Sequence, residues 1–377
     1  MISILADSNI PFLRGLLEPV AKVTYLPAGM ITRDKLSHHD ALIIRTRTRC
    51  DESLLKDTTV KFIGTATIGM DHIDTRWCES VGIRVVNAPG CNSGAVMQYI
   101  TSALVHITKL YGETPEGTTV GIVGAGNVGK KVIKAALALG MKVLVNDPPR
   151  EETEGREGFV SLQRLAAESD IISFHTPLTS DGAYPTRHLG NRNFFSSLKK
   201  GTIIINSSRG GVIDEEALKN AICRNIVAGA VIDTWEGEPR ADAELVAMCD
   251  IATPHIAGYS LEGKRNAALM IIKDVAGFFN LDSSLIKTPE PLPGELEISL
   301  SVNREIPETL NAVIKAAYDI EKDSNNFRSS PGLFEEIRNS YPVRREFSGF
   351  RVTGSDSLPN LCLVLEKLGF NIADRSQ

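Results

Sequence analysis

Three polar residues of the kinds used in proton transfer and anion binding each follow a short apolar run. They are Arg209, Glu238 and His255. A histidine suits the role of general base because it titrates near neutral pH, and a neighbouring carboxylate favours and orients the imidazolium. An arginine forks onto a carboxylate and polarises the oxygen beside it. Each residue alone is often structural, but the set predicts proton removal from a 2-hydroxy acid as a hydride leaves the same carbon.

The elements that must position these residues are strands of one parallel sheet. Six apolar runs predict the strands Val120–Val123, Lys142–Asn146, Ile171–His175, Thr202–Asn206, Ala228–Asp233 and Ile251–Thr253. In an open α/β sheet, ligands bind beyond the carboxyl ends of the strands. The three polar residues follow the last three runs, so we expect them to face one crevice.

A glycine-rich turn follows the first of these predicted strands. The segment Gly124-Ala-Gly126-Asn127-Val128-Gly129 precedes an amphipathic helix, which is the strand–turn–helix context of a dinucleotide site. Asp147 ends the next predicted strand, where its carboxylate can accept hydrogen bonds from the ribose hydroxyls and repel the 2′-phosphate of NADP. The sequence therefore predicts NAD, and Arg150 nearby is the one feature that favours NADP.

A second alternating series precedes this sheet. Apolar runs predict strands at Ile2–Ala6, Ala41–Arg45, Phe62–Thr65 and Arg84–Asn87. Apolar residues at helical spacing predict long helices at Ser93–Tyr111 and Leu261–Phe279, the second of which would return the chain to the first domain. We therefore expect residues 96–259 to be a cofactor domain inserted into a domain formed by 1–95 and 260–286.

The remaining residues, 287–377, are expected to form a small α+β module. The proline-rich segment Thr288–Gly294 indicates a linker. Beyond it the pattern predicts helices at Glu308–Asp319, Leu333–Asn339 and Pro359–Leu368 and a strand at Phe350–Thr353. No residues in these predicted elements have the types and spacing of a catalytic site.

Composition narrows the class of partner. The formal net charge is −5, and no long Lys/Arg run indicates nucleic acid or an anionic membrane as a partner. The early acid Asp7 argues against a signal peptide, and no stretch approaches the roughly 18 apolar residues of a membrane span. The six cysteines and seven histidines lack metal-site spacing, so we expect free thiols, no metal and a cytoplasmic location.

The catalytic and cofactor segments resemble the D-2-hydroxyacid dehydrogenase family over about the first 285 residues. The resemblance implies an α/β fold with a flavodoxin-like, doubly wound substrate domain, an inserted Rossmann NAD domain and an arginine–glutamate–histidine triad. Further segments resemble the branch of the family that oxidises 4-phospho-D-erythronate to 2-oxo-3-hydroxy-4-phosphobutanoate, toward pyridoxal 5′-phosphate. These segments are Gly64–Asp74, Ala88–Asn92, His175–Leu178, Trp235–Pro239 and His255–Gly263. This branch uses its C-terminal module to form a homodimer.

The same resemblance implies further site residues by matching position. Thr46, Thr67 and Tyr259 should contact the substrate. Thr176, Asp233 and Gly258 should contact NAD. Thr46 departs from the serine of the family pattern but keeps the hydroxyl.

A phosphorylated substrate requires cations at its far end. Arg45, Arg47 and Arg49 would share one side of an extended chain, which makes Arg45 and Arg47 candidates for a phosphate clamp. A solvated basic strand end explains the same alternation equally well. Arg344, Arg345 or Arg351 of a partner subunit are further candidates.

Other interpretations stay open at this point. His72 and His175 are tempting catalysts, but packing roles are more usual for single histidines. D-3-phosphoglycerate or another D-2-hydroxy acid is an alternative substrate, although the tail does not resemble a regulatory amino-acid-binding module. A non-enzymatic NAD-sensing corepressor is the alternative from a different class, and it would not require the complete triad.

Overall fold

The computed structural model describes residues 1–300, 306–354 and 358–373. The chain divides into two compact units. The first comprises residues 1–92 and 260–293, and the second comprises residues 93–259 and 294–377. The C-terminal segment thus groups with the six-stranded sheet and does not form a compact unit of its own.

The first unit contains a five-stranded parallel sheet in the order β2-β1-β3-β4-β5. The strands are β1 Ser3–Asp7, β2 Lys22–Leu26, β3 Ala41–Ile44, β4 Phe62–Thr65 and β5 Arg84–Val86. This is the flavodoxin-like order, and it confirms the fold expected for this region. Helix α11 (Leu261–Phe278) packs against β4, where Gly64 leaves room for the side chain of Ile271. The edge strand β2 was not predicted.

Short helices complete this unit. They are α1 Arg33–Leu36, α2 Glu52–Leu55 and α3 Thr75–Ser80. Asp51 caps α2 and Asp74 caps α3, because each carboxylate accepts hydrogen bonds from the first backbone N–H groups of its helix.

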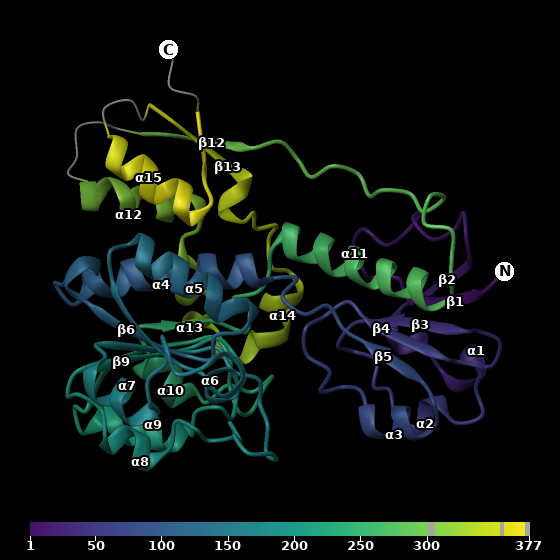
Figure 1. Ribbon diagram of the computed structural model, residues 1–377, viewed down its shortest axis with the longest axis horizontal. Helices are drawn as coiled ribbons and strands as arrows, with labels where there is room; N and C mark the ends of the chain where they lie inside the picture. The colour runs from purple at the N-terminus through teal and green to yellow at the C-terminus, as the bar shows by residue number, and fades with distance from the viewer. Residues whose placement is uncertain (301–305, 355–357, 374–377) are drawn as a thin grey trace. The chain divides into compact units, whose positions relative to one another are not determined.

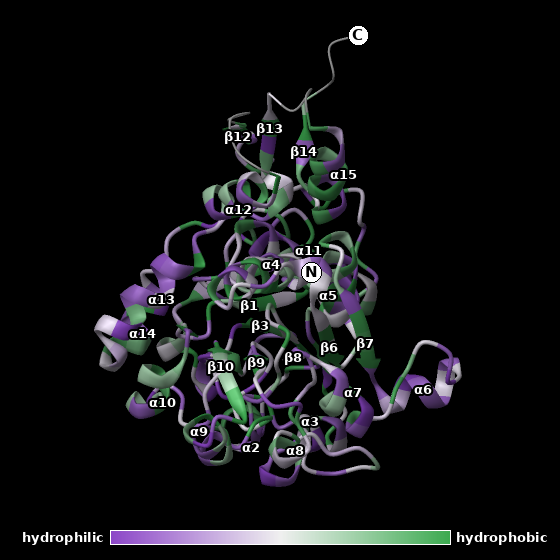
Figure 2. Cartoon of the chain, turned by 90° about the vertical axis from the view of Figure 1, so that its left-hand side faces the viewer, coloured by the Kyte–Doolittle hydropathy of each residue, from purple (hydrophilic) through white to green (hydrophobic). Residues whose placement is uncertain are grey.

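The second unit contains a six-stranded parallel sheet in the order β11-β10-β9-β8-β6-β7. The strands are β6 Thr119–Val123, β7 Lys142–Asn146, β8 Ile171–Phe174, β9 Thr202–Asn206, β10 Val227–Ile232 and β11 Ile251–Ala252, which confirms all six predicted runs. Figure 2 shows the apolar character of β7 and β10. The Val160 N–H also donates to the Val145 carbonyl at 2.8 Å, which places residue 160 beside the edge strand β7.

Helices cover both faces of this sheet. Helices α4 (Ser93–Leu110) and α5 (Asn127–Ala138) lie on one face, and α7–α10 lie on the other (Figure 1). The remaining helices of the sheet domain are α6 Pro148–Glu154, α7 Leu162–Glu168, α8 Arg192–Ser196, α9 Glu215–Cys223 and α10 Ala243–Met248. Burial on both faces explains why the strands are continuous apolar runs instead of alternating ones.

The C-terminal segment forms a three-stranded parallel sheet in the order β12-β13-β14. Its elements are β12 Leu296–Ser299, α12 Ile306–Ala317, α13 Ile320–Ser329, α14 Phe334–Asn339, β13 Phe350–Thr353, α15 Pro359–Leu368 and β14 Asn371–Ile372. The linker Thr288–Gly294 has no regular structure, as predicted.

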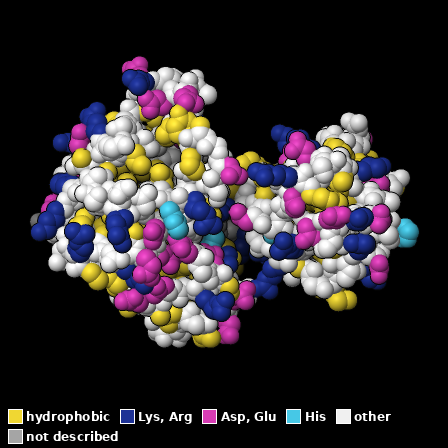
Figure 3. Space-filling model, turned by 90° about the horizontal axis from the view of Figure 1, so that it is seen from below, with side chains coloured by type: hydrophobic (Ala, Val, Ile, Leu, Met, Phe, Trp, Pro, Cys, Tyr) yellow, Lys and Arg dark blue, Asp and Glu magenta, His cyan; other side chains and the backbone are white. Residues whose placement is uncertain are grey.

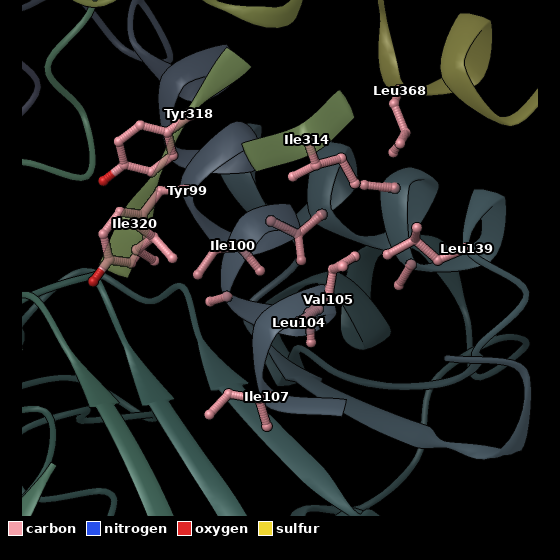
Figure 4. Packing of buried hydrophobic residues seen from close by; sticks show 14 of the residues in the cluster. Tyr99, Ile100, Leu104, Val105, Ile107, Leu139, Ile314, Tyr318, Ile320 and Leu368 are labelled. Carbon is pink, nitrogen blue, oxygen red and sulfur yellow. The ribbon is translucent and has the colours of Figure 1, made fainter. Parts of the chain in front are cut away.

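This C-terminal segment shares a hydrophobic core with α4 and α5. Ile314 and Tyr318 from the tail lie beside Tyr99 and Ile100 of α4 (Figure 4). Helix α13 also contacts β11, where the Ser324 hydroxyl accepts a hydrogen bond from the Ala252 N–H at 3.0 Å. The tail is therefore packed against the strand that ends just before His255.

Charged side chains of both signs are interspersed on the face seen in Figure 3. None of the helices described is both long enough and apolar enough to cross a membrane. Within the described ranges, no cluster of three or more His, Cys, Asp or Glu residues has the arrangement of a metal site.

Candidate active site

Arg209, Glu238 and His255 lie on the turns that follow β9, β10 and β11. These three strands are neighbours and parallel, so their carboxyl ends meet at one edge of the sheet. The topology thus places the three predicted residues on adjacent turns of the second unit.

His255 and Glu238 form a hydrogen-bonded pair. The imidazole Nδ1 lies 2.8 Å from Glu238 Oε2, and Glu238 Oε1 accepts a hydrogen bond from the Trp235 N–H at 3.0 Å. Burial raises the pKa of the Glu238 carboxyl, but the hydrogen bond and the charge of His255 outweigh burial and hold the pKa below its usual value. The carboxylate is therefore ionised at neutral pH. Because Nδ1 faces Glu238, Nε2 is the ring nitrogen left for a substrate.

Asp233 organises the turn that carries His255. Its fully buried carboxylate accepts hydrogen bonds from the Thr253 hydroxyl at 2.6 Å and from the N–H groups of Ile256 at 2.8 Å and Ala257 at 2.9 Å. Burial raises the pKa of this carboxyl, and these donors act in the opposite direction. His255 itself has a φ of 57°, a left-handed conformation that a histidine adopts only when its surroundings impose it. The Asp233 contacts supply that constraint.

Arg209 lies in a tight turn held by Asn206. The Asn206 side chain donates to the Arg209 carbonyl at 3.0 Å and accepts from the Ser208 N–H at 3.1 Å. The next residue, Gly210, approaches the backbone of the neighbouring turn so closely that an added Cβ would lie 1.9 Å from the Trp235 carbonyl oxygen. Only glycine allows this approach, which joins the turn of Arg209 to the turn that leads to Glu238.

The glycine-rich turn after β6 has the shape expected of a dinucleotide site. Gly124 has a φ of 90°, and an added Cβ on Gly129 would lie 2.0 Å from the Gly124 carbonyl oxygen. Gly126 instead faces open space, and α5 begins at Asn127 and Val128. The open approach and the free N–H groups of a helix N-terminus fit a pyrophosphate.

Asp147 lies beside this turn, as its position after β7 predicts. Its carboxylate accepts a hydrogen bond from the Ala125 N–H at 2.8 Å. Arg150 donates to Glu154 at 2.8 Å and to the Ala125 carbonyl at 2.6 Å. Its guanidinium is thus already engaged, which weakens the argument that it serves a 2′-phosphate.

Three hydroxyl groups that follow strand ends are buried without a hydrogen-bond partner in the described ranges. They belong to Thr176, after β8, Ser207, after β9, and Thr234, after β10. Unsatisfied buried hydroxyls are costly, so each is a candidate ligand contact. Sequence analysis selected Thr176 but missed Ser207, although its place directly after β9 was an available signal.

The Nδ1 atom of His175 is buried, and its Nε2 lies 2.9 Å from the Ser173 hydroxyl. Burial lowers the pKa of this imidazole to about 3. Burial also lowers the pKa of His72, whose Nε2 lies 3.2 Å from the Thr65 hydroxyl. Both environments support packing roles.

The first unit contains the remaining predicted substrate contacts. Thr67 donates from its hydroxyl to the Gly69 carbonyl at 3.0 Å, and Thr46 is exposed. The expectation of an extended chain that aligns Arg45, Arg47 and Arg49 is wrong, because residues 46–48 form a turn. Arg45 donates to the Asn9 carbonyl at 3.2 Å, and Arg49 pairs with Asp51 at 2.9 Å.

Tyr259 follows Gly258, which lies in the turn after His255. The Tyr259 ring contacts two residues of the C-terminal segment, namely Tyr341 with ring centroids 5.8 Å apart and Arg338 with its guanidinium 5.6 Å from the ring centroid. Sequence analysis did not select Arg338. It did suggest Arg344 as a contribution from a partner subunit, but Arg344 is buried within its own chain, where it donates to the carbonyls of Ala95 and Ala257.

The chain is similar to known proteins along nearly its whole length. Residues 97–257 match the family model described as D-isomer specific 2-hydroxyacid dehydrogenase, NAD binding domain, and residues 289–369 match a domain of unknown function (DUF3410). The erythronate-4-phosphate dehydrogenase of Bacteroides fragilis (strain YCH46) is 47% identical, with 93% of this chain and 99% of the relative covered. That of Escherichia coli O9:H4 (strain HS) is 39% identical, with 98% of each covered.

Solved structures of D-2-hydroxyacid dehydrogenases are similar to about three quarters of the chain. The D-lactate dehydrogenase of Aquifex aeolicus, complexed with NAD and lactic acid, is 26% identical with a TM-score of 0.61, and the match covers 74% of this chain and 95% of that one. The NAD+-bound 3-phosphoglycerate dehydrogenase of Entamoeba histolytica is 25% identical with a TM-score of 0.60 and the same coverage.

Proposed function

Because the chain belongs to the erythronate-4-phosphate dehydrogenase family, we propose that it oxidises 4-phospho-D-erythronate at C2 with NAD. The product would be 2-oxo-3-hydroxy-4-phosphobutanoate, on the route to pyridoxal 5′-phosphate. The observation that carries the proposal is the His255–Glu238 pair, 2.8 Å apart, on the two turns that follow the strands next to that of Arg209. The matched relatives carry the name of one dehydrogenase, which does not favour the phosphoglycerate and NAD-sensor alternatives.

The three residues have distinct roles in this reaction. His255 Nε2 takes the proton of the C2 hydroxyl, so that the C2–O single bond becomes a carbonyl as the C2–H bond breaks. Glu238 holds Nδ1 and stabilises the imidazolium that forms. Arg209 anchors the substrate carboxylate and polarises the adjacent C2 oxygen. NAD, when bound, accepts the hydride that leaves C2.

The cofactor contacts follow from the second unit. Gly124, Gly126 and Gly129, with the first residues of α5, Asn127 and Val128, would hold the pyrophosphate, and Asp147 would bind the adenosine ribose. Thr176, Asp233 and Gly258 are the contacts proposed toward the rest of NAD, and the unpaired hydroxyl adds Ser207 to this set.

The substrate contacts remain proposals of two kinds. Thr46, Thr67 and Tyr259 would contact the carbon chain and its hydroxyls. Arg45 and Arg47 follow β3 and carry the charge needed by a phosphate, although Arg45 also donates to Asn9.

We also propose a three-part organisation of the chain. Residues 1–95 with 260–286 would bind the substrate, 96–259 NAD, and 287–377 the second copy of a homodimer. The tail contributes three short strands, whose edges and exposed Leu296 and Leu363 offer surface for such an interface. Sedimentation of the purified chain would test the dimer, and the mass of a single chain would refute it.

The six cysteines are free thiols, and five of them are buried. Free thiols agree with a protein that acts in the reducing cytoplasm.

The substrate proposal is tested by following NAD reduction at 340 nm with 4-phospho-D-erythronate and 3-phosphoglycerate side by side. A second series includes a 2-oxo acid acceptor, because reduced cofactor can stay bound. A clear preference in kcat/KM for 4-phospho-D-erythronate is expected. A preference for 3-phosphoglycerate would keep the mechanism and reject the substrate.

The clamp proposal is tested by Arg45→Ala and Arg47→Ala. Each should raise the KM for 4-phospho-D-erythronate about tenfold, because a charge-assisted contact to phosphate is lost. An unchanged KM in both variants would remove these arginines from the clamp.

A further inference from the structure

We propose that Arg338, on α14 of the same chain, binds the phosphate of the substrate. This inference rests on the proposed function, because it assumes a phosphorylated 2-hydroxy acid. It assigns the C-terminal segment a specificity-determining residue in addition to any role in assembly.

Arg338 is brought to the active site by aromatic packing. Its guanidinium carbon lies 5.6 Å from the ring centroid of Tyr259 and 5.6 Å from that of Phe334, which is buried. Tyr259 also contacts Tyr341, two residues beyond the end of α14, so two residues of the tail pack against this tyrosine. Tyr259 lies four residues after His255, and this places Arg338 beside the catalytic turn.

An electrostatic interaction links Arg338 to the catalytic pair as well. Burial raises the pKa of Glu238, but the hydrogen bond and charge of His255, the Trp235 N–H and the positive charge of Arg338 together hold it below its usual value. Arg338 is therefore near enough for its charge to act on the partner of the catalytic base.

The donors of Arg338 are not all used by the protein. Its Nε is buried and has no hydrogen-bond partner in the described part of the chain. Aromatic faces attract a cation but give its N–H groups no oxygen acceptor, and a buried donor without an acceptor is costly. An anion at this position would satisfy the donor and offset the buried charge. Arg344 also has buried donors without a partner in the described residues, but the whole residue is buried over the Tyr318 ring and its Nη2 donates to the carbonyls of Ala95 and Ala257.

The substrate offers two anionic groups, and the geometry points to the phosphate. Arg209 lies on the turn joined through Gly210 to the Glu238 turn, and it serves the carboxylate next to the reacting C2. Arg338 comes from the C-terminal segment and lies beside Tyr259, so we assign it the other anionic group of the substrate, the phosphate. A guanidinium is well suited to a phosphate because its fork matches two phosphate oxygens.

The test compares 4-phospho-D-erythronate with D-erythronate, which lacks the phosphate, as substrates of the full-length enzyme with NAD. Arg338→Met keeps the aliphatic contact with the rings and removes the charge, whereas Arg338→Lys keeps the charge. We expect Arg338→Met to lower kcat/KM for the phosphorylated substrate roughly ten- to hundredfold through KM, with kcat/KM for D-erythronate changed less than threefold. Arg338→Lys should fall between Arg338→Met and the wild type.

Arg224→Gln is the matched control. Arg224 is exposed at the end of α9, before β10 begins, and so lies at the opposite end of the strands from the catalytic turns. It should behave as the wild type with both substrates. Equal losses with both substrates in Arg338→Met, or no loss with either, would overturn the proposal in favour of a structural role.

A direct binding measurement separates this proposal from the proposed function. If the wild type oxidises neither substrate, the proposed function fails, and calorimetric titration of inorganic phosphate into the NAD-loaded protein then decides the inference. Phosphate binding that is at least tenfold weaker in Arg338→Met than in the wild type and in Arg224→Gln supports it. Equal binding in all three proteins, or no binding to the wild type, overturns it.

Discussion

Two histidines follow strands of the same sheet and differ in almost every other respect. His255 follows β11, is partly exposed, and pairs with the carboxylate of Glu238 at 2.8 Å. His175 follows β8, and its Nε2 lies 2.9 Å from the Ser173 hydroxyl, while its Nδ1 is buried without a hydrogen-bond partner in the described residues. Burial lowers the pKa of His175 to about 3. A position at the carboxyl end of a strand therefore does not make a histidine a base.

The difference lies in what each strand end offers to a charged ring. The His255 turn supplies a carboxylate held below its usual pKa, together with solvent access on one side. The His175 turn supplies burial with no opposite charge, and burial alone disfavours the imidazolium. We infer that the His255 turn performs proton transfer and that the His175 turn lines the NAD site.

Gly210→Ala should lower turnover more than the other three variants that test this comparison. The added Cβ would meet the Trp235 carbonyl oxygen at 1.9 Å, so the turns of Arg209 and Glu238 must separate. Because displacement by about 1 Å costs catalysis heavily, kcat should fall about a hundredfold. Gly117→Ala, whose Cβ meets only an ordinary contact at 3.7 Å, is the control in steady-state assays. Full activity of Gly210→Ala would show that the two turns do not act together.

Glu238→Gln should have the next largest effect. The amide keeps the size of the carboxylate but cannot stabilise an imidazolium by charge, so kcat/KM should fall roughly ten- to a hundredfold. The loss in kcat/KM is measured with saturating NAD across pH 6 to 9. His188→Gln is the control for histidine–carboxylate pairs in general, because it removes the exposed contact of His188 with Glu236. Equal losses in the two variants would remove the special role given to the His255 region.

Gly124→Ala should sharpen the comparison from the other side. This residue has a φ of 90°, and an added Cβ would lie 2.8 Å from the His175 carbonyl oxygen. The strain falls on the His175 turn, which we propose lines the NAD site, so the KM for NAD should rise about tenfold while kcat changes less. A fall in kcat with an unchanged KM for NAD would contradict the division between the two regions.

His175→Gln should have the smallest effect on turnover and a measurable effect on stability. Because the folded-state pKa of His175 is lowered from 6.5 to about 3, the unfolded chain binds this proton first as the pH falls. The wild type thus loses stability between pH 6.5 and 3, at up to about 1.4 kcal/mol per pH unit. Urea unfolding at pH 7 and pH 5 should show about 2 kcal/mol less loss in the variant. Identical losses would mean that His175 is protonated in the folded protein.

Much of the fold was predictable because parallel strands buried on two faces are continuous apolar runs. The six runs from Val120 to Thr253 gave all six strands of the cofactor sheet, and the residues after them gave the catalytic turns. The edge strand β2 and the short strands β12 and β14 were not predicted, because partly exposed strands have no continuous apolar run. Helix α13 was not predicted, because the residues between its buried positions are strongly polar.

The site was predictable only as far as local pattern reaches. His255, Glu238 and Asp147 stand next to recognisable strands, and their neighbours in the fold are the neighbouring strands. Arg338 is separated from Tyr259 by 79 residues and reaches it through packing of the tail, which no local spacing records. The turn at residues 46–48 also prevents the alternate arginines from sharing one side, since alternate side chains align only in an extended chain.

The central claim is that His255, and not His175, is the base of hydride transfer. It is tested most directly by single-turnover NAD reduction at 340 nm with 4-phospho-D-erythronate, in the wild type, His255→Gln and His175→Gln. We expect the rate of His255→Gln to fall by about 10³-fold or more and that of His175→Gln to fall by less than about tenfold. Comparable rates in His255→Gln and the wild type would contradict the account.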